Sequence, residues 1–251
     1  MSPAPHIKVG ILTGFGINAD VELAQAFELA GARAELLPVT SLVDEPQRLK
    51  DLQILGFPGG FSFGDHLGSG RVLAQLVKQR LKDELMAFVD RGGLVLGVCN
   101  GFQTLVKMGI LPNLKGDWTP ETTLIGNDIG CFQDRWVQVS YNTKNTSPWI
   151  RGLSDADLPI RHGEGRFQVA DEAILRTLHE KNLVAVTYRG HNPNGAVDAI
   201  AGITDSTGRI FGLMPHPEAF VTRLNHPLWR RRTEVGPLGL QIFQNGVKHF
   251  Q

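Results

Sequence analysis

The stretch LVLGVCNGFQTL, Leu94–Leu105, decides the fold, because it runs from an apolar strand through a sharp turn into a helix. LVLGV is short and apolar throughout, as expected of a central parallel strand with helices over both faces. Gly97 and Gly101 flank Cys99 in the pattern Gly-x-nucleophile-x-Gly, where a tight turn leaves the nucleophile in strained backbone. A helix beginning near Asn100 would favour the thiolate form of this cysteine. Cys99 is therefore a candidate nucleophile, and the alternative is a buried cysteine that only fills space.

The rest of the first half alternates strand-like and helix-like segments. IKVGIL (7–12) and QILGF (53–57) have the character of buried strands. Residues 20–31 predict a helix that Asp20 can cap, and residues 71–93 repeat apolar side chains at helical spacing until two glycines end the pattern. This rhythm predicts an α/β fold with a doubly wound, mostly parallel sheet flanked by helices.

The pattern changes in the second half, where strand-like segments joined by turns predict added antiparallel strands. These segments are DRWVQVSYN (134–142), LPIRHGEGRFQV (158–169), LVAVTYRG (183–190) and AIAGITDSTGRIFGLM (199–214). The closing segment 236–250 predicts a helix, with Pro237 in its first turn and one apolar face. We expect a single domain spanning residues 1–251.

Composition excludes several classes of function. The 251 residues carry 25 Lys plus Arg and 25 Asp plus Glu, and the pI near 7.1 offers no electrostatic footprint for nucleic acid. No apolar run is long enough to span a bilayer, and the N-terminus lacks the features of a signal peptide. Two cysteines make no disulfide framework, and no metal-ligand spacing is present. Cys131 is expected to be a packed thiol, because no glycine-flanked turn surrounds it. The sequence predicts a cytoplasmic protein with no metal, no membrane contact and no nucleic acid partner.

A candidate base for the cysteine lies in the segment GLMPHPEAF near the C-terminus. Pro215 and Pro217 favour extended backbone in the residues before them, and in extended chain residues i and i+2 point to one side. His216 and Glu218 therefore point the same way, so the histidine can take the thiol proton while the carboxylate fixes its tautomer. Alone, His-Pro-Glu is more typical of a surface turn; with Cys99 it predicts a Cys-His-Glu triad.

An oxyanion hole can be assembled from two segments. In a nucleophile turn the amide of the next residue, here Asn100, points at the developing oxyanion. A second amide usually comes from a loop after a neighbouring strand, and the segment FPGG follows such a strand. Gly59 or Gly60 is expected to supply it; without the cysteine, Pro-Gly-Gly would indicate only a turn.

Taken together, these motifs resemble those of the class I (triad) glutamine amidotransferases. GVCNGFQ, the PGG loop and PHPE occur in the order typical of that class. PGGFSFGDHLGSG, RHGEGRF, NPNG with IAGIT, MPHPE and QIFQN resemble the glutaminase subunits of phosphoribosylformylglycinamidine synthase, of purine biosynthesis. The resemblance covers nearly the whole chain.

This resemblance implies both a chemistry and a set of partners. Cys99 would attack the side-chain amide of L-glutamine to give a γ-glutamyl thioester and ammonia, with His216 and Glu218 completing the triad. It implies glutamine contacts from Gly59, Gln103, His162 and Gly163, and Gln103 also lies one helical turn past the nucleophile. It implies no cofactor for this chain. The partners would be an ATP-dependent synthetase subunit and a small accessory subunit.

The chain also departs from the family pattern. Family members usually have arginine after PHPE, whereas Ala219 stands here, so the role of that arginine is either lost or passed to a neighbour such as Arg223. Residues 117–127 and 225–236 make the chain longer than the smallest stand-alone subunits. They resemble a longer form fused to the synthetase, although a full first strand after Met1 favours a separate polypeptide.

Three other interpretations of the sequence remain. Gly14-x-Gly16-x-x-Ala19, with Glu35 downstream, has the outline of a dinucleotide-binding fingerprint, but it leaves the triad motifs unexplained. The scaffold could instead be a non-catalytic regulatory module, although the intact triad disfavours this. A glutamyl hydrolase, or the glutaminase of another amidotransferase, would keep the triad and differ in its partner.

Overall fold

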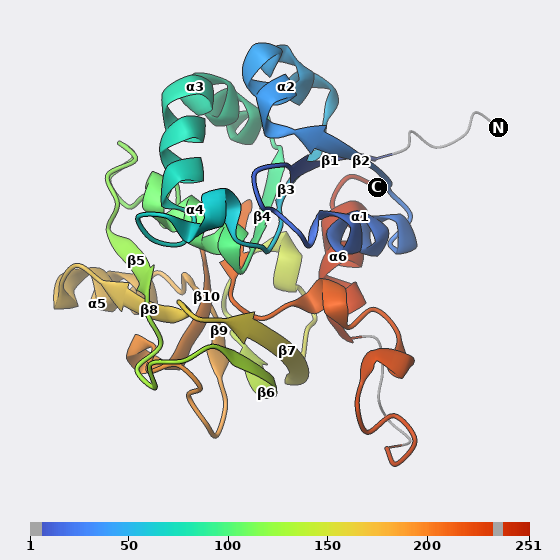
Figure 1. Cartoon of the computed structure of the whole chain (residues 1–251), viewed down its shortest axis with the longest axis vertical. Coiled ribbons are helices and arrows are strands. Elements are labelled where there is room, and N and C mark those ends of the chain that lie inside the picture. The colour runs from blue at the N-terminus through green and yellow to red at the C-terminus, as the bar shows by residue number, and fades with distance from the viewer. Residues whose placement is uncertain (1–6, 233–237) are drawn as a thin grey trace.

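A computed structural model of the chain describes residues 7–232 and 238–251. Most of its strands belong to one mixed sheet (Figure 1), with the order β2-β1-β3-β4-β11-β10-β9-β6-β7. The first five strands in this order are mutually parallel: β2 (Arg33–Pro38), β1 (Lys8–Thr13), β3 (Ile54–Phe57), β4 (Leu94–Val98) and β11 (Ile210–Leu213). The predicted doubly wound half is thus confirmed.

The remaining strands of the sheet run antiparallel to their neighbours, as the second half of the sequence predicts. They are β10 (Ile200–Thr204), β9 (Val184–Tyr188), β6 (Gln133–Tyr141) and β7 (Ala156–His162). The segment Asp205–Gly208 turns β10 back into β11, closed by the Gly208 amide on the Asp205 carbonyl at 3.1 Å. A separate two-stranded sheet pairs β5 (Thr122–Ile125) with β8 (Arg166–Val169).

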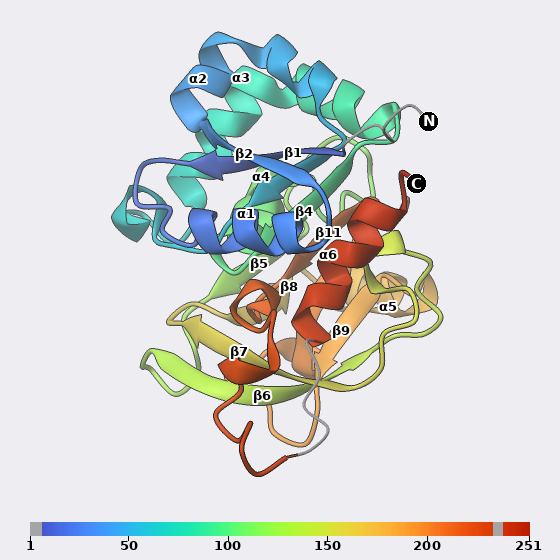
Figure 2. The same cartoon turned by 90° about the vertical axis from the view of Figure 1, so that its right-hand side faces the viewer.

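Helices cover both faces of the parallel half. α1 (Asp20–Leu29) and α6 (Leu238–Lys248) lie side by side on one face (Figure 2). α3 (Arg71–Asp90) and α4 (Asn100–Met108) pack together on the other, with α2 (Val39–Asp44) beside α3 and α5 (Glu172–Glu180) beside β8. In the part of the chain that the structure describes, no helix is long and apolar enough to cross a membrane.

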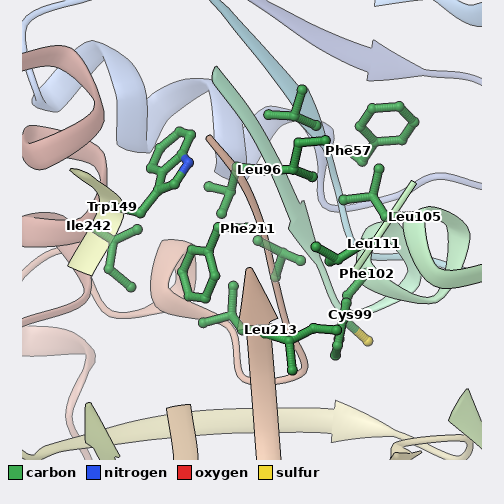
Figure 3. Packing of buried hydrophobic residues seen from close by; sticks show 14 of the residues in the cluster. Phe57, Leu96, Cys99, Phe102, Leu105, Leu111, Trp149, Phe211, Leu213 and Ile242 are labelled. Carbon is green, nitrogen blue, oxygen red and sulfur yellow. The ribbon is translucent and has the colours of Figure 1, made fainter. Parts of the chain in front are cut away.

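The core lies between these layers and consists of strand side chains with the inner faces of the helices (Figure 3). Phe27 of α1 makes edge-to-face contacts with Trp149 and with Phe243 of α6, at centroid distances of 6.3 Å and 5.0 Å. Such aromatic pairs add to the stability gained from burial. The apolar face predicted for the last helix therefore packs inward, while Pro237 lies outside the described residues.

One capping prediction is wrong in detail. Asp20 is the first residue of α1 and not its cap, because Ala19 occupies that position without a side-chain hydrogen bond. The Asp20 carboxylate instead accepts a hydrogen bond from the hydroxyl of Thr13, at the end of β1. A negative charge in the first turn is still favourable there because of the helix dipole.

The register of the central strands positions the loops that follow them. Gly97 of β4 lies opposite Phe57 of β3 on one side and Gly212 of β11 on the other. Since the three strands are parallel, their carboxyl ends meet at one edge of the sheet, where ligands of such folds bind. The PGG loop, Cys99 and the PHPE segment therefore lie together.

Candidate active site

Cys99 lies in the turn between β4 and α4, in the strained backbone that its flanking glycines predict. Its φ and ψ are +51° and −105°, a conformation that a side-chain-bearing residue rarely adopts. A Cβ on Gly101 would lie 1.9 Å from the carbonyl oxygen of Phe57, so only glycine lets α4 approach β3 this closely. The Cys99 amide donates to the Leu213 carbonyl at 2.8 Å, which ties the turn to the end of β11.

The sulfur of Cys99 lies at the edge of the cluster of buried apolar side chains (Figure 3). The residue is 5% exposed, and its neighbours Phe102 and Leu213 are fully buried. Sγ lies 3.6 Å from the main-chain oxygen of Arg161 on β7, which accepts the weak thiol hydrogen bond. The thiol is thus oriented by the antiparallel half of the sheet, although the parallel half carries it.

His216 and Glu218 form the predicted pair directly after β11. Nδ1 of His216 lies 2.6 Å from Oε1 of Glu218, and both side chains are buried. Burial by itself lowers the pKa of His216, but the negative charges of Glu218 and Cys99 outweigh it and raise this pKa to about 10. Nε2 makes no hydrogen bond to the described residues while the thiol is directed at Arg161. The ring can therefore hold a proton beside the sulfur at neutral pH.

The PGG loop lies against this pair. Gly60 has a φ of +146°, and a Cβ there would lie 2.8 Å from the Asn18 nitrogen. Asn18 donates to the Gly59 carbonyl and Phe61 donates to Gly16, so the hydrogen bonds that fix the loop come from residues on either side of Gly60. Gly59 packs directly on the ring of His216.

Asn100 and Gln103 begin α4 beside this loop. The Asn100 amide is in the first turn of the helix, where no intrahelical acceptor exists, so it can serve an anion at Cys99. Its side chain accepts from the Ser62 amide at 3.2 Å and donates to Oε1 of Gln103 at 3.0 Å. Nε2 of Gln103 donates in turn to the Glu164 carbonyl at 2.6 Å. Gln103 is therefore tied to the segment that contains His162 and Gly163.

His162 is buried at the end of β7 and held in one tautomer. The Asn127 side-chain amide donates to the carbonyls of Cys131 and His162, each at 2.9 Å, so its oxygen must face the other way. That oxygen accepts from the Gly165 amide at 2.9 Å and from Nδ1 of His162 at 3.2 Å. Nδ1 therefore carries the proton and Nε2 presents a lone pair. Burial and the nearby His216 lower the pKa of His162 to about 4, so this ring is neutral at neutral pH.

Comparison with known proteins agrees with this geometry. A sequence model of the CobB/CobQ-like glutamine amidotransferase domain matches residues 6–250. The chain belongs to this family. Two relatives are "Phosphoribosylformylglycinamidine synthase subunit PurQ" from Dehalococcoides mccartyi, 42% identical, and from Methanococcus maripaludis, 36% identical. The alignments cover 96% and 97% of this chain and 97% of each relative.

A solved structure adds the fold of a relative. A chain in the PurLQS structure from Thermotoga maritima superimposes with a TM-score of 0.77 at 27% identity, covering 98% of this chain and all of that one. The amidotransferase fold inferred from the sequence is thereby confirmed, with a parallel first half and an antiparallel second half.

The fingerprint-like loop has a structural role in this amidotransferase. Gly16 and Asn18 pair with the PGG loop through their main chains, and Ala19 donates to the Gly59 carbonyl at 3.2 Å. The turn between β1 and α1 is therefore filled by the loop that carries Gly60. The glycines that suggest a dinucleotide site support the candidate oxyanion hole instead.

The structure bears on two expectations about single residues in the amidotransferase. Nη2 of Arg223 donates to the carbonyls of Trp229 and Arg232, in its own segment, so of the two alternatives for the missing arginine these contacts favour a lost role. Cys131 is exposed and not packed, since it lies in the loop before β6. Both cysteines are free.

Sequence reasoning also missed residues that shape the site. Arg161 contacts Cys99, His216 and Glu218 from β7, and Tyr188 is buried on β9 with its hydroxyl 3.3 Å from Nδ2 of Asn194. Arg161 directly precedes the motif HGEGRF, which is the signal that could have identified it. Among the described residues, no group of three or more His, Cys, Asp or Glu side chains is placed to hold a metal ion.

Proposed function

We propose that this amidotransferase is the glutaminase subunit of phosphoribosylformylglycinamidine synthase, and that Cys99, His216 and Glu218 are its triad. The triad is supported by one observation: a strained cysteine and a buried His-Glu pair follow the ends of two adjacent parallel strands, β4 and β11. The assignment to this synthase is supported by full-length relatives that carry its name.

In the first half of the proposed reaction the thiolate of Cys99 attacks the side-chain carbonyl carbon of glutamine. The carbonyl oxygen becomes an oxyanion, which the amides of Gly60 and Asn100 receive as hydrogen-bond donors. His216, protonated beside the sulfur, gives its proton to the departing nitrogen, so the C–N bond breaks and ammonia leaves. A γ-glutamyl thioester remains on the cysteine.

In the second half water replaces ammonia. His216 takes a proton from water as its oxygen attacks the thioester, and the same two amides hold the second oxyanion. The C–S bond then breaks, releasing glutamate and returning the thiolate and imidazolium pair. Glu218 keeps the proton on Nδ1 throughout, because the two atoms are 2.6 Å apart and buried.

Four further residues are proposed to hold glutamine: Gly59, Gln103, His162 and Gly163. Gln103 has an amide that can exchange the Glu164 carbonyl for a substrate carbonyl, since both are acceptors. Nε2 of neutral His162 makes no hydrogen bond to the described residues, so it can accept an N–H of the substrate.

Ammonia is proposed to pass within a complex to a synthetase that uses ATP and formylglycinamide ribonucleotide, with a small accessory subunit also present. The similarity to a chain of the PurLQS structure supports this assembly. Enclosure has a physical reason, because ammonia released to neutral water is mostly protonated and no longer nucleophilic. The continuous sheet supports a single domain, and the need for ATP supports a cytoplasmic location.

The test compares two cysteine variants in the complex with a synthetase. Cys99→Ala is expected to abolish glutamine-dependent synthesis and leave synthesis from added ammonium salts unchanged, because only the ammonia source is lost. Cys131→Ala, which removes the exposed free cysteine, is the matched control and should keep both activities. Glutamine-dependent synthesis by Cys99→Ala would remove Cys99 from its role.

The same complex tests the partner assignment. A glutamine-like diazoketone should label Cys99 and not Cys131, as mapped by peptide mass spectrometry. Because Cys99 is only 5% exposed, glutamine turnover by the chain alone should be weak and should rise when the synthetase is added. If synthesis requires a different acceptor from formylglycinamide ribonucleotide, the chain serves another amidotransferase.

A further inference from the structure

Arg161 touches every member of the proposed triad. Its main-chain oxygen lies 3.6 Å from the sulfur of Cys99. Its Nη2 lies 3.2 Å from Nδ1 of His216 and 3.8 Å from Oε1 of Glu218. The same Nη2 donates to Oε2 of Glu22 on α1 at 3.0 Å.

The carboxylate of Glu218 is fully buried and sparsely paired. Its side chain is 0% exposed, its Oε1 faces His216 and Arg161, and its Oε2 has no hydrogen-bond partner in the described part of the chain. A buried charge is strongly destabilising unless an opposite charge lies close to it. His216 loses its positive charge when it gives the proton of Nε2 to ammonia, so Arg161 is the positive charge that remains beside Glu218.

The guanidinium is suited to remain charged. Burial opposes the charge, but the hydrogen bond that Arg161 donates to Glu22 and the negative charges of Glu22 and Glu218 outweigh it and raise the pKa of Arg161. Glu22 is half exposed and belongs to a different layer, so it anchors the guanidinium from outside the triad.

The hydrogen-bonding rules fix what the contact with His216 does. Arginine can only donate, and Nδ1 of His216 must also donate if it is to hold the proton toward Glu218. Nδ1 therefore donates to Oε1 of Glu218 at 2.6 Å, while Nη2 lies 3.8 Å from the same oxygen as an ion-pair partner and not as a hydrogen-bond donor. With the guanidinium present, moving the proton from Nδ1 to the carboxylate would leave Arg161 facing a neutral acid.

We propose that Arg161 is a positioning residue of this amidotransferase. Its guanidinium keeps Glu218 ionised and in place, so that His216 keeps its proton on Nδ1 and its Nε2 available to Cys99. It supplies the positive charge beside Glu218 that Ala219 cannot supply. This role rests on the proposed triad.

The test is the pH dependence of glutamine turnover in the complex with the synthetase. Arg161→Met should lower kcat about 10- to 100-fold, while KM changes less than about threefold. The loss is limited because the Arg161 side chain is partly exposed, so solvent weakens its interaction with Glu218. The acid limb of kcat/KM should move to higher pH, because the positive charge of Arg161 beside the His216–Glu218 pair opposes the uptake of a proton there and is lost in the variant. Arg161→Lys should restore the position of the acid limb, and Arg161→Gln should not.

The controls separate this role from folding and from the triad itself. Arg189→Met removes an exposed arginine that pairs with Asp155 and should leave the pH profile unchanged. Synthesis from ammonium salts should be unchanged in every variant, which reports a folded complex. If Arg161→Met fails to assemble, the test still stands, because Arg161→Lys should restore the position of the acid limb and Arg161→Gln should not.

Three results would overturn the role of Arg161: an unshifted acid limb in Arg161→Gln, equal loss in Arg161→Lys and Arg161→Gln, or a rise in KM with kcat unchanged. The last would mean that the guanidinium binds glutamine. These outcomes are distinct from failure of the triad, which would appear as glutamine use by Cys99→Ala.

Discussion

Replacing Gly101 with alanine tests whether the close contact of α4 with β3 sets the catalytic geometry. The new Cβ would lie 1.9 Å from the carbonyl oxygen of Phe57, against an ordinary contact of 3.4 Å, so the helix must move by about 1.5 Å. That shift displaces Cys99 and Asn100 from Gly60, and a misplacement of about 1 Å costs on the order of 100-fold in rate. Overpacking should also destabilise the protein by about 1–3 kcal/mol.

The assay pairs glutamine-dependent synthesis with urea unfolding. Gly101→Ala should lower kcat about 100-fold, keep synthesis from ammonium salts, and reduce the urea midpoint. Gly126→Ala is the matched control, because a Cβ there meets nothing within 4 Å. Glutamine turnover within about threefold of the parent at an unchanged midpoint would refute the reasoning, since the backbone would then tolerate the side chain.

Two further predictions concern the histidines. The pKa of His162 is lowered to about 4 in the folded chain, so the unfolded chain binds a proton first as pH falls from about 6.5. The free energy of unfolding should therefore drop by up to about 3 kcal/mol between pH 6.5 and pH 4. In urea titrations His162→Gln should flatten this pH dependence. If the free energy of unfolding changes with pH equally in the parent and in His162→Gln, this prediction is contradicted. The pKa of His216, raised to about 10, should fall in Glu218→Gln, as followed by NMR of the ring protons. A ring that titrates identically in the two proteins would show that Glu218 does not hold its charge.

Much of the site could be predicted because its signals are local. Glycines stand two residues before and two residues after Cys99 in a strand-turn-helix segment, and two prolines favour a common direction for His216 and Glu218. The parallel half was predictable for the same reason, since its strands and helices alternate in sequence. That these motifs meet follows from parallel strands ending at one edge.

What sequence alone could not give depends on contacts between distant segments. Arg161 reaches the triad because β7 crosses near the end of β11, where the His216 amide donates to the Pro159 carbonyl at 2.8 Å. No spacing between residues 161 and 216 encodes that crossing. Arg223 is closer to Glu218 in sequence, but its Nη2 is satisfied by its own segment, so proximity along the chain does not tell which arginine lies beside Glu218.

The position of β11 inside the sheet has a consequence for synthesis of the chain. β11 lies between β4 and β10, although more than a hundred residues separate it from β4 in sequence. A nascent chain that ends before residue 210 holds its nucleophile on an unpaired strand edge and has no imidazole beside it. The growing polypeptide therefore stays inert toward glutamine until residues 210–218 emerge from the ribosome, and it depends on their rapid synthesis to bury that edge.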